Sequence, residues 1–296
     1  MSKESTSTNG GVHVTTEMLM HASKTTLAKG ESTEHYLHRI THLTLNNKKL
    51  TSMTNLHRCT NVKVVLYMYD NKIASIDATL SSLRHLTHVH LQRNRISKIE
   101  HFDALVHLEK LYLDGNQISR LEGLANCTSL QELHLSNQVA APSSGDEFTF
   151  DEDSIMTLRH SLRILHAANC NIRNPAPIQA LGRLELLDLS RNHIRGVDAV
   201  YGLVGNLRRL KDLNLTNNHV NATPKYRDNT IIFSHASLAV LDTKPIDANQ
   251  RATMQSHMAF KHKKRLATAS SIKTKIDAFQ VHGSNTWVGG SPNQDQ

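Results

Sequence analysis

The side chains best suited to metal or acid–base chemistry in this sequence are its 20 histidines. His88 and His90 share one face of a predicted strand, because side chains alternate along a strand, and His134 and His166 follow at the same position of later strands. A metal site needs ligands that converge on one point, whereas neighbouring strands hold their side chains in a row about 4.8 Å apart. We therefore expect neither a metal site nor a cofactor.

The remaining chemistry-bearing residues also favour a protein without enzymatic activity. Cys59, Cys127 and Cys170 are widely spaced and form no CxxC pair, so we expect small buried thiols in a reducing compartment rather than disulfides or a zinc cluster. The sequence contains no phosphate-binding glycine loop, no nucleophile elbow, no HExxH and no kinase signature. The regular spacing of these histidines is explained instead by an internal repeat of the sequence.

An internal repeat with the pattern L-x-x-L-x-L-x-x-N-x-L determines where these side chains lie. Four complete copies begin at Leu86, Leu108, Leu184 and Leu210. Four weaker copies begin at Ile40, Lys63, Leu130 and Leu162. In the copy that begins at Lys63, the apolar residues Val62, Val64 and Val65 indicate one extra residue at the start of the strand. Most copies follow one another after 22 or 23 residues, which is the period of leucine-rich repeats. Because one repeat cannot bury its own leucines, such repeats stack.

The predicted fold is therefore α/β: a leucine-rich-repeat solenoid with a parallel concave sheet and short convex helices, capped at both ends. Convex positions are marked by a second apolar pair after each strand, as in Ile73 and Ile76 or Ile118 and Leu121. The polar position of the pattern is asparagine in five copies, where it can satisfy buried backbone groups. Lys48, Gln138 and Cys170 replace it in the other three, so we expect less regular turns there.

The repeats also divide the chain. We expect a disordered N-terminus at 1–13, an N-terminal cap at 14–37, eight repeats at 38–222, a C-terminal cap at 223–250 and a basic, mostly disordered tail at 251–296. The first cap would cover the first strand with Met18, Leu19, Leu27, Tyr36 and Leu37. A long acidic insertion at 139–155 interrupts the repeats and ends in a helix-like pattern of Ile155, Leu158 and Leu162. It is either a functional excursion or a solvated loop.

The net charge of +8 belongs mainly to the tail. Residues 251–296 hold seven basic and two acidic residues, a net charge of +5, which leaves +3 for the first 250 residues. Nucleic-acid binding by the repeats is therefore disfavoured. The run from Lys261 to Arg265 is a nuclear signal, a contact for acidic surfaces such as microtubules or nucleic acid, or solvated linker charge. No apolar stretch is long enough for a membrane span, and we expect a cytoplasmic protein, with the nucleus as an alternative.

Residues between the strand leucines face outward on the predicted concave surface. Three of the chain's six tyrosines fall there, among charged residues and histidines. Exposed aromatic side chains flanked by charges are typical anchors of protein interfaces. The predicted partner-binding residues are Tyr67, Tyr69, His88, His90, Lys110, Tyr112, Asp114, Glu132, His134, His166 and Asp188.

Residues 14–265 resemble the testis leucine-rich-repeat protein family, regulatory subunits of protein phosphatase 1. The likeness is carried by Ile40-Thr41-His42, Leu66-Tyr67-Met68-Tyr69-Asp70-Asn71, Leu108-Glu109-Lys110-Leu111-Tyr112-Leu113, Glu132-Leu133-His134, Asn137-Gln138 and Pro224-Lys225-Tyr226-Arg227-Asp228. It implies binding to the phosphatase catalytic subunit and a location at the cytoskeleton and centrosome, the microtubule-organising centre, with microtubule-associated or motor proteins as further partners.

One departure bears on how such binding would occur. The linear phosphatase-docking motif, basic-x-Val/Ile-x-Phe/Trp, is absent, and Lys275-Ile276-Asp277-Ala278-Phe279 has a spacing one residue too long. A phosphatase contact would therefore use the concave face. The alternatives are a structural component of the cilium, axoneme or microtubule-organising centre without phosphatase binding, and a repeat protein that grips an RNA-binding partner, which the weakly charged repeats disfavour. Whether binding activates or inhibits the partner stays open.

Overall fold

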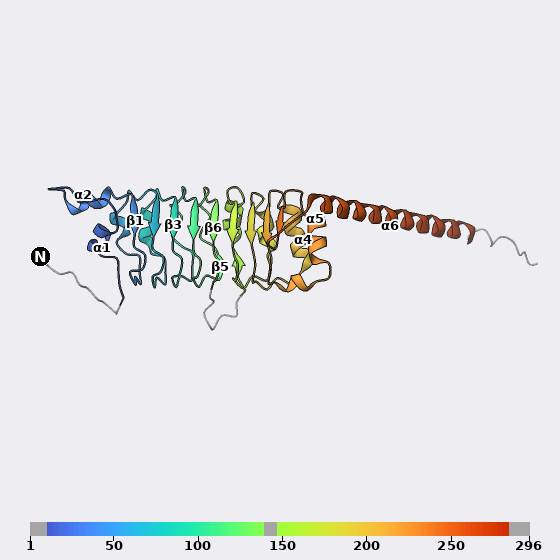
Figure 1. Ribbon diagram of the computed structural model, residues 1–296, viewed down its shortest axis with the longest axis horizontal. Coiled ribbons are helices and arrows are strands. Elements are labelled where there is room, and N and C mark those ends of the chain that lie inside the picture. Colours follow the sequence, from blue (N-terminus) through green and yellow to red (C-terminus); the bar gives the residue numbers. More distant parts are fainter. Residues whose placement is uncertain (1–10, 139–146, 284–296) are drawn as a thin grey trace, which may run out of the picture. The chain divides into compact units, whose positions relative to one another are not determined.

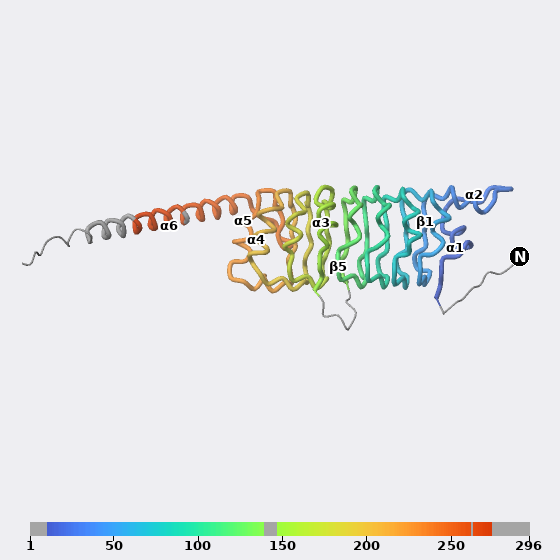
Figure 2. The backbone as a smooth tube through the Cα atoms, turned by 180° about the vertical axis from the view of Figure 1, so that it is seen from behind, coloured from blue at the N-terminus to red at the C-terminus, as the bar shows by residue number. Residues whose placement is uncertain are grey.

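The computed structural model describes residues 11–138 and 147–283. It consists of two units, Met1–Ile246 and Asp247–Gln296. The first unit is a solenoid whose successive coils each contribute one short strand to a single sheet (Figure 1). Figure 2 shows the same coils from behind, stacked in the order of the sequence.

Ten strands form this sheet, and the first eight are parallel and follow chain order. They coincide with the eight copies of the repeat pattern, and the predicted leucine-rich-repeat solenoid is confirmed. The parallel strands are β1 (His42–Thr44), β2 (Val65–Tyr67), β3 (His88–His90), β4 (Lys110–Tyr112), β6 (Glu132–His134), β8 (Ile164–His166), β9 (Leu186–Asp188) and β10 (Asp212–Asn214). At the C-terminal end, β11 (Val240–Leu241) pairs in parallel with β10 and antiparallel with β12 (Lys244–Pro245).

A continuous row of aliphatic side chains forms the centre of the core. The middle residue of each parallel strand is fully buried and is in register with the middle residues of its neighbours, as for Leu43, Leu66 and Val89. Burying one such side chain stabilises the fold by about 1.5–3 kcal/mol. In the second repeat Val62 is buried and Val64 is 39% exposed, which accommodates the extra residue without shifting the strand. Cys59, Cys127 and Cys170 are free and buried, as expected.

The opposite side of the coils carries short helices, most of them single 3₁₀ turns. These elements are η1 (Leu56–Arg58), η2 (Ala78–Ser82), α3 (Glu152–Leu158), η3 (Ala176–Ala180) and α4 (Val197–Asn206). The helix predicted at the end of the insertion is α3, whose first turn is capped by the Asp151 carboxylate accepting from the Ser154 amide. After Ile118, a strand that includes Leu121 replaces the expected convex helix, because β5 (Arg120–Leu121) pairs in parallel with β7 (Thr149–Phe150) of the insertion. Residues 139–146 of the predicted insertion lie outside the described part of the chain.

Buried amide side chains connect each coil to the one before it. The Asn116 amide nitrogen donates to the carbonyls of Leu91 and Leu113 at 3.0 and 2.8 Å, and its oxygen accepts from the Ile96 amide at 3.0 Å. The same three groups are engaged at the other asparagine positions, which are Asn71, Asn94, Asn192 and Asn218. These side chains satisfy backbone groups that no strand reaches.

The three exceptional positions behave differently from one another. Our expectation of a less regular turn at Gln138 is wrong, because its longer side chain brings an equivalent amide to Leu113, Leu135 and Ile118 at 2.8–2.9 Å. The Cys170 thiol donates to the Leu135 carbonyl at 3.0 Å but has no amide oxygen to offer. The side chain of Lys48 is exposed, since no earlier strand of the repeat array lies beyond it.

The N-terminal cap contains α1 (Thr16–His21) and α2 (Thr33–His38). Leu19, Tyr36 and Leu37 are buried, and the Ala22 carbonyl accepts from the Thr44 amide at the open edge of β1. The expectation that Leu27 covers the core is wrong, because this side chain is 45% exposed. Residues 11–13, which we expected to be disordered, lie against the first repeat, where the Val12 carbonyl accepts from the Thr51 amide at 2.8 Å. Residues 1–10 lie outside the described part of the chain.

The C-terminal cap is built from η4 (His219–Ala222), α5 (Tyr226–Phe233) and the strand pair β11–β12. Arg227 of α5 donates to the carbonyls of Leu241 and Pro245 at 2.8 and 3.1 Å. The Asp242 carboxylate accepts from the Leu215 amide at 2.7 Å, at a position where earlier coils donate to a backbone carbonyl of the next coil. The cap therefore closes the array by hydrogen bonds that are chemically similar to those within it.

The second unit contains α6 (Ala248–Gly283), and our expectation of a mostly disordered tail is wrong for residues 251–283. Residues 248–282 contain neither glycine nor proline and are rich in good helix formers such as Ala, Lys and Gln, so helix propensity outweighs the low apolar content on which we relied. Residues 284–296 lie outside the described part of the chain. Within the described residues, no helix combines the length and the apolar character that a membrane crossing needs.

Candidate protein-binding face

The outward side of the ten-stranded sheet is the surface predicted to be concave, and we call it the sheet face. Strand register sorts its side chains into parallel rows. The central row comes from the last residue of each strand and consists of Thr44, Tyr67, His90, Tyr112, His134, His166, Asp188 and Asn214. The order is the one predicted from the repeat. The sheet brings nine of the predicted residues into this row and the one beside it, which holds His88, Lys110 and Glu132.

Five consecutive rings of the central row stack on one another, and we call them the aromatic ladder. Their centroids lie 4.7, 4.3, 4.6 and 4.5 Å apart from one ring to the next, close to the spacing between neighbouring strands. Each such contact contributes about 0.5–1.5 kcal/mol beyond simple burial. The ladder is made of Tyr67, His90, Tyr112, His134 and His166. The sequence predicts the row but not the stacking, which depends on side-chain rotamers.

Tyr69 extends the aromatic surface to the third row. Its ring meets Tyr67 edge to face at 6.2 Å, and the Arg93 guanidinium lies 5.8 Å from its centre. Arg93 also forms an ion pair with Asp70 at 2.7 Å, which holds the pKa of the Asp70 carboxyl below its usual range. Sequence reasoning missed Asp70 and Arg93. The available signal was their opposite charge at the same position of consecutive repeats.

Glu132 is the polar centre of the sheet face. Its carboxylate accepts from the Tyr112 hydroxyl at 3.0 Å, contacts His134 Nε2 at 2.9 Å and pairs with the Lys110 ammonium at 2.9 Å. Burial by itself raises the pKa of Glu132, but the bonds from Lys110, His134 and Tyr112 together outweigh it and lower that pKa to about 2. Burial, followed by the bond to Glu132, raises the pKa of Tyr112 to about 12. These groups hold one another in a fixed arrangement.

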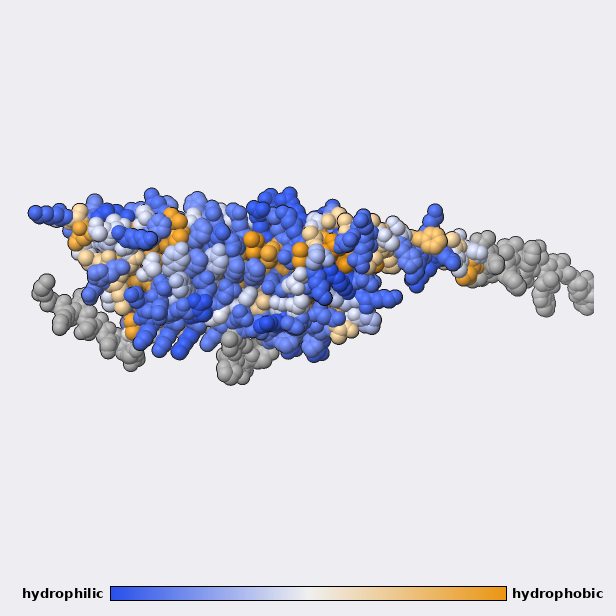
Figure 3. Space-filling view, in the orientation of Figure 1, coloured by the Kyte–Doolittle hydropathy of each residue, from blue (hydrophilic) through white to orange (hydrophobic). Residues whose placement is uncertain are grey.

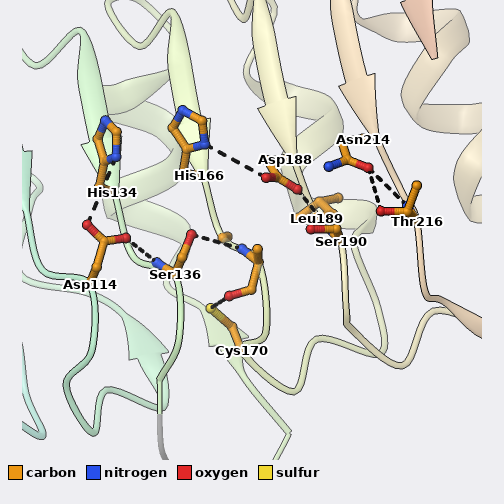
Figure 4. A network of polar contacts seen from close by, with 12 residues as sticks. Asp114, His134, Ser136, His166, Cys170, Asp188, Leu189, Ser190, Asn214 and Thr216 are labelled. Carbon is orange, nitrogen blue, oxygen red and sulfur yellow. Dashed lines mark hydrogen bonds and ion pairs between the residues drawn. The ribbon is translucent and has the colours of Figure 1, made fainter. Parts of the chain in front are cut away.

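Two further carboxylates stand beside ladder histidines (Figure 4). Asp114 lies 4.0 Å from His134 Nδ1 and accepts from the Ser136 amide at 2.8 Å. In the same way, Asp188 lies 3.9 Å from His166 Nδ1 and accepts from the Ser190 amide at 2.9 Å. Burial raises the pKa of Asp188. The bonds from His166 and the Ser190 amide lower this pKa by a larger amount, so the net shift is downward.

His90, in contrast, forms no ion pair with a carboxylate among the described residues. Burial between its ladder neighbours, followed by the charges of His88 and His134, lowers the pKa of His90 to about 4. Its ring is therefore neutral near pH 7, which allows it to stack between two phenols without the cost of burying a charge. The ladder histidines stack side by side rather than converge, and within the described residues no group of three or more His, Cys, Asp or Glu could hold a metal ion.

Sequence reasoning also missed an apolar part of the sheet face. The row formed by the first residue of each strand contains Ile164 and Leu186 on neighbouring strands, both half-buried. They contribute to a hollow of about 450 Å³ whose rim is charged. Figure 3 shows a mostly hydrophilic surface with small apolar areas in this view. The signal was present, because apolar residues at outward positions of a strand are unusual on a wet face.

Parts of the sequence match two models of leucine-rich repeats. Residues 64–118 match the family described as leucine rich repeat, and residues 106–143 match leucine rich repeats in two copies. Among solved structures, an internalin C2 from Listeria monocytogenes is 21% identical, covering 68% of this chain and 92% of that one, with a TM-score of 0.47. A leucine-rich-repeat protein of Leptospira interrogans is 20% identical, covering 75% of this chain and 66% of that one, with a TM-score of 0.40.

The matched models, the stacked parallel strands and the bridging asparagines agree with one another. Leucine-rich repeats are typically non-enzymatic scaffolds for protein–protein interaction, and no catalytic family is indicated by these matches. The chain contains leucine-rich repeats and folds as a capped solenoid, an architecture typical of protein-interaction scaffolds.

Proposed function

We propose that the sheet face binds the catalytic subunit of protein phosphatase 1 and that the chain acts as a regulatory subunit. The observation that carries a protein-binding role is the aromatic ladder, five rings in unbroken contact across neighbouring strands. Large aromatic side chains with a polar edge are the usual anchors of protein interfaces. The identity of the partner is supported by the sequence resemblance to phosphatase-binding repeat proteins.

The arrangement of the anchors favours tight binding. Tyr112 is held by Glu132, and Tyr67 is held between His90 and Tyr69. Side chains that are already fixed lose little conformational freedom when a partner covers them, and this lowers the entropic cost of association. The open, extended face suits a broad protein surface better than a small substrate, because it lacks the enclosure that chemistry requires.

A binding titration with purified phosphatase catalytic subunit tests the proposal. We expect wild-type protein to bind, and a Tyr67→Ala/Tyr69→Ala/Tyr112→Ala variant to bind at least 30-fold more weakly, because one interface anchor contributes about 2 kcal/mol or more. The matched control is Tyr201→Ala/Phe233→Ala, which removes a ring pair with centroids 4.6 Å apart between α4 and α5, away from the sheet face. Circular dichroism confirms that each variant is folded.

The outcomes separate the two parts of the proposal. Equal binding by wild type and the triple variant removes the sheet face as the contact. Absence of binding by wild type removes the phosphatase as the partner. A loss that is equally large in the control variant would mean that aromatic content in general, and not the ladder, determines binding.

A structural role at the cilium, axoneme or microtubule-organising centre is a second candidate, favoured by α6. Between Asp247 and Asp277 this segment contains no acidic residue, whereas Lys261, Lys263, Lys264 and Arg265 lie close together. A cationic helix of this kind suits an acidic protein surface. Localisation of the tagged full chain, compared with a variant in which these four residues are Gln, tests the idea; diffuse signal from both proteins counts against it.

A further inference from the structure

The hollow on the sheet face has an apolar floor. Ile164 of β8 and Leu186 of β9 are register partners, so their side chains lie side by side on the outward surface, and both are half-buried. On the next strand, Asp212 is the register partner of Leu186. The hollow has a volume of about 450 Å³, which is large enough for one long side chain of a partner.

Every cationic group on the rim of this hollow already has a carboxylate partner. Lys110 pairs with Glu132 at 2.9 Å on one side. On the other side, Arg163 and Lys211 both pair with Glu185, at 2.6 and 2.7 Å. A carboxylate or phosphate of a ligand would therefore have to displace an existing partner.

Asp212 is the exception among these charged groups. Within the described residues, its carboxylate forms no hydrogen bond or ion pair, although it is half-buried. Burial, followed by the charge of Asp188 on the next strand, raises the pKa of Asp212. A partly desolvated carboxylate next to a second one is an unfavourable arrangement that a cation would relieve.

We propose that this hollow receives a lysine or arginine side chain of a protein partner, with its aliphatic stem on Ile164 and Leu186 and its charged end at Asp212. The inference rests on the proposed function in one respect only, namely that the sheet face binds a protein. Lysine and arginine combine an apolar stem with a cationic end, as this site requires. A purely apolar side chain would cover the floor and leave Asp212 without a partner.

The chain's own Lys211 does not fill this role. Its ammonium lies 2.7 Å from Glu185 and its side chain is 66% exposed, so it stands at the rim and not over the floor. Removal of Lys211 from Glu185 would leave that carboxylate with Arg163 alone. The cation for Asp212 therefore comes from outside the chain.

Methyl NMR on the full chain tests the site with defined probes. Protein labelled at isoleucine and leucine methyl groups is titrated with the N-acetyl methylamides of lysine, arginine, norleucine and glutamate. We expect the lysine and arginine probes to shift the Ile164 and Leu186 methyl signals in a saturable way, and norleucine and glutamate to bind at least fivefold more weakly. Asp212→Asn should reduce the affinity for lysine and arginine at least fivefold, whereas Asp198→Asn on α4, away from the sheet, should not change it.

Several results would overturn the inference. These are equal affinity for norleucine and lysine, unchanged affinity in Asp212→Asn, or no shift of either methyl signal with any probe. The proposed function is judged separately by the phosphatase titration. Saturable binding of the probes to a protein that does not bind phosphatase removes the phosphatase but keeps the site, and the reverse pattern removes the site but keeps the phosphatase.

Discussion

The imidazole of His90 lies against the phenol ring of Tyr112, with centroids 4.3 Å apart and ring planes inclined by only 12°. It is the closest ring contact of the aromatic ladder, and it joins a residue of β3 to one of β4. The contact depends on a neutral imidazole, because a charged ring at this half-buried position would lose hydration. Stability and protonation on the sheet face are therefore coupled at one pair of side chains.

Removal of the His90 ring should weaken the repeat array. In His90→Ala two ring contacts are lost, with Tyr67 and with Tyr112, and each contributes about 0.5–1.5 kcal/mol. We expect the free energy of unfolding, measured by urea denaturation, to fall by about 1–3 kcal/mol. His42→Ala is the control, since His42 is exposed on β1 outside the ladder. An equal change in both variants would show that stacking contributes nothing.

The protonation of His90 should make stability depend on pH. Its pKa in the folded chain is about 4, lowered from the ordinary 6.5 by burial and then by the charges of His88 and His134. The stability gained from a neutral His90 is therefore complete above pH 6.5 and is lost as the pH falls toward 4. Wild type should lose stability relative to His90→Phe across this window in urea denaturation at several pH values. Parallel pH profiles for the two proteins would contradict the expectation.

Glu132 should contribute in the same direction at lower pH. Its folded pKa is about 2 against an ordinary 4.5, because the bonds from Lys110, His134 and Tyr112 outweigh the effect of burial. The stabilisation is present above pH 4.5 and disappears as the pH falls through 2. Glu132→Gln should be less stable than wild type near neutral pH, and this difference should shrink below pH 4.5. Asp103→Asn, at an exposed position, serves as the control.

The bridging amide of Asn116 should be among the most sensitive positions of the core. This residue is 1% exposed, and Asn116→Ala would leave the carbonyls of Leu91 and Leu113 and the amide of Ile96 without their partners. A buried polar group without a partner costs about 1–3 kcal/mol, so we expect a loss of about 3 kcal/mol or more in the free energy of unfolding. Asn126→Ala, at an exposed position, should change it by less than about 0.5 kcal/mol.

The repeat pattern predicts the strands and the central row well, for a simple physical reason. Leucines at alternating positions can be buried only if the residues between them face outward, so Tyr67 and His90 had to share a row once their strands became neighbours. The approximate length of each coil follows from the same pattern, and the predicted fold is correct.

Other features depend on interactions that the pattern does not contain. The pairing of β5 with β7 joins residues about 30 positions apart through the insertion, and no periodicity indicates such a contact. We expected a less regular turn at Gln138 because it is not asparagine. Its side-chain amide has the same donors and acceptor as that of asparagine, and it makes the same hydrogen bonds. A helix was considered only for the start of the tail, and the full length of the helix at 248–283 was underestimated because low hydrophobicity was weighed more heavily than the absence of glycine and proline.

The ring types of the aromatic ladder also follow a regular order. Its rungs alternate between phenol and imidazole from Tyr67 to His134, with one rung for each coil. A partner that slipped by one rung, about 4.8 Å, would meet an imidazole where it was matched to a phenol. The alternation thus gives a repetitive surface a defined alignment, which identical rungs would not provide.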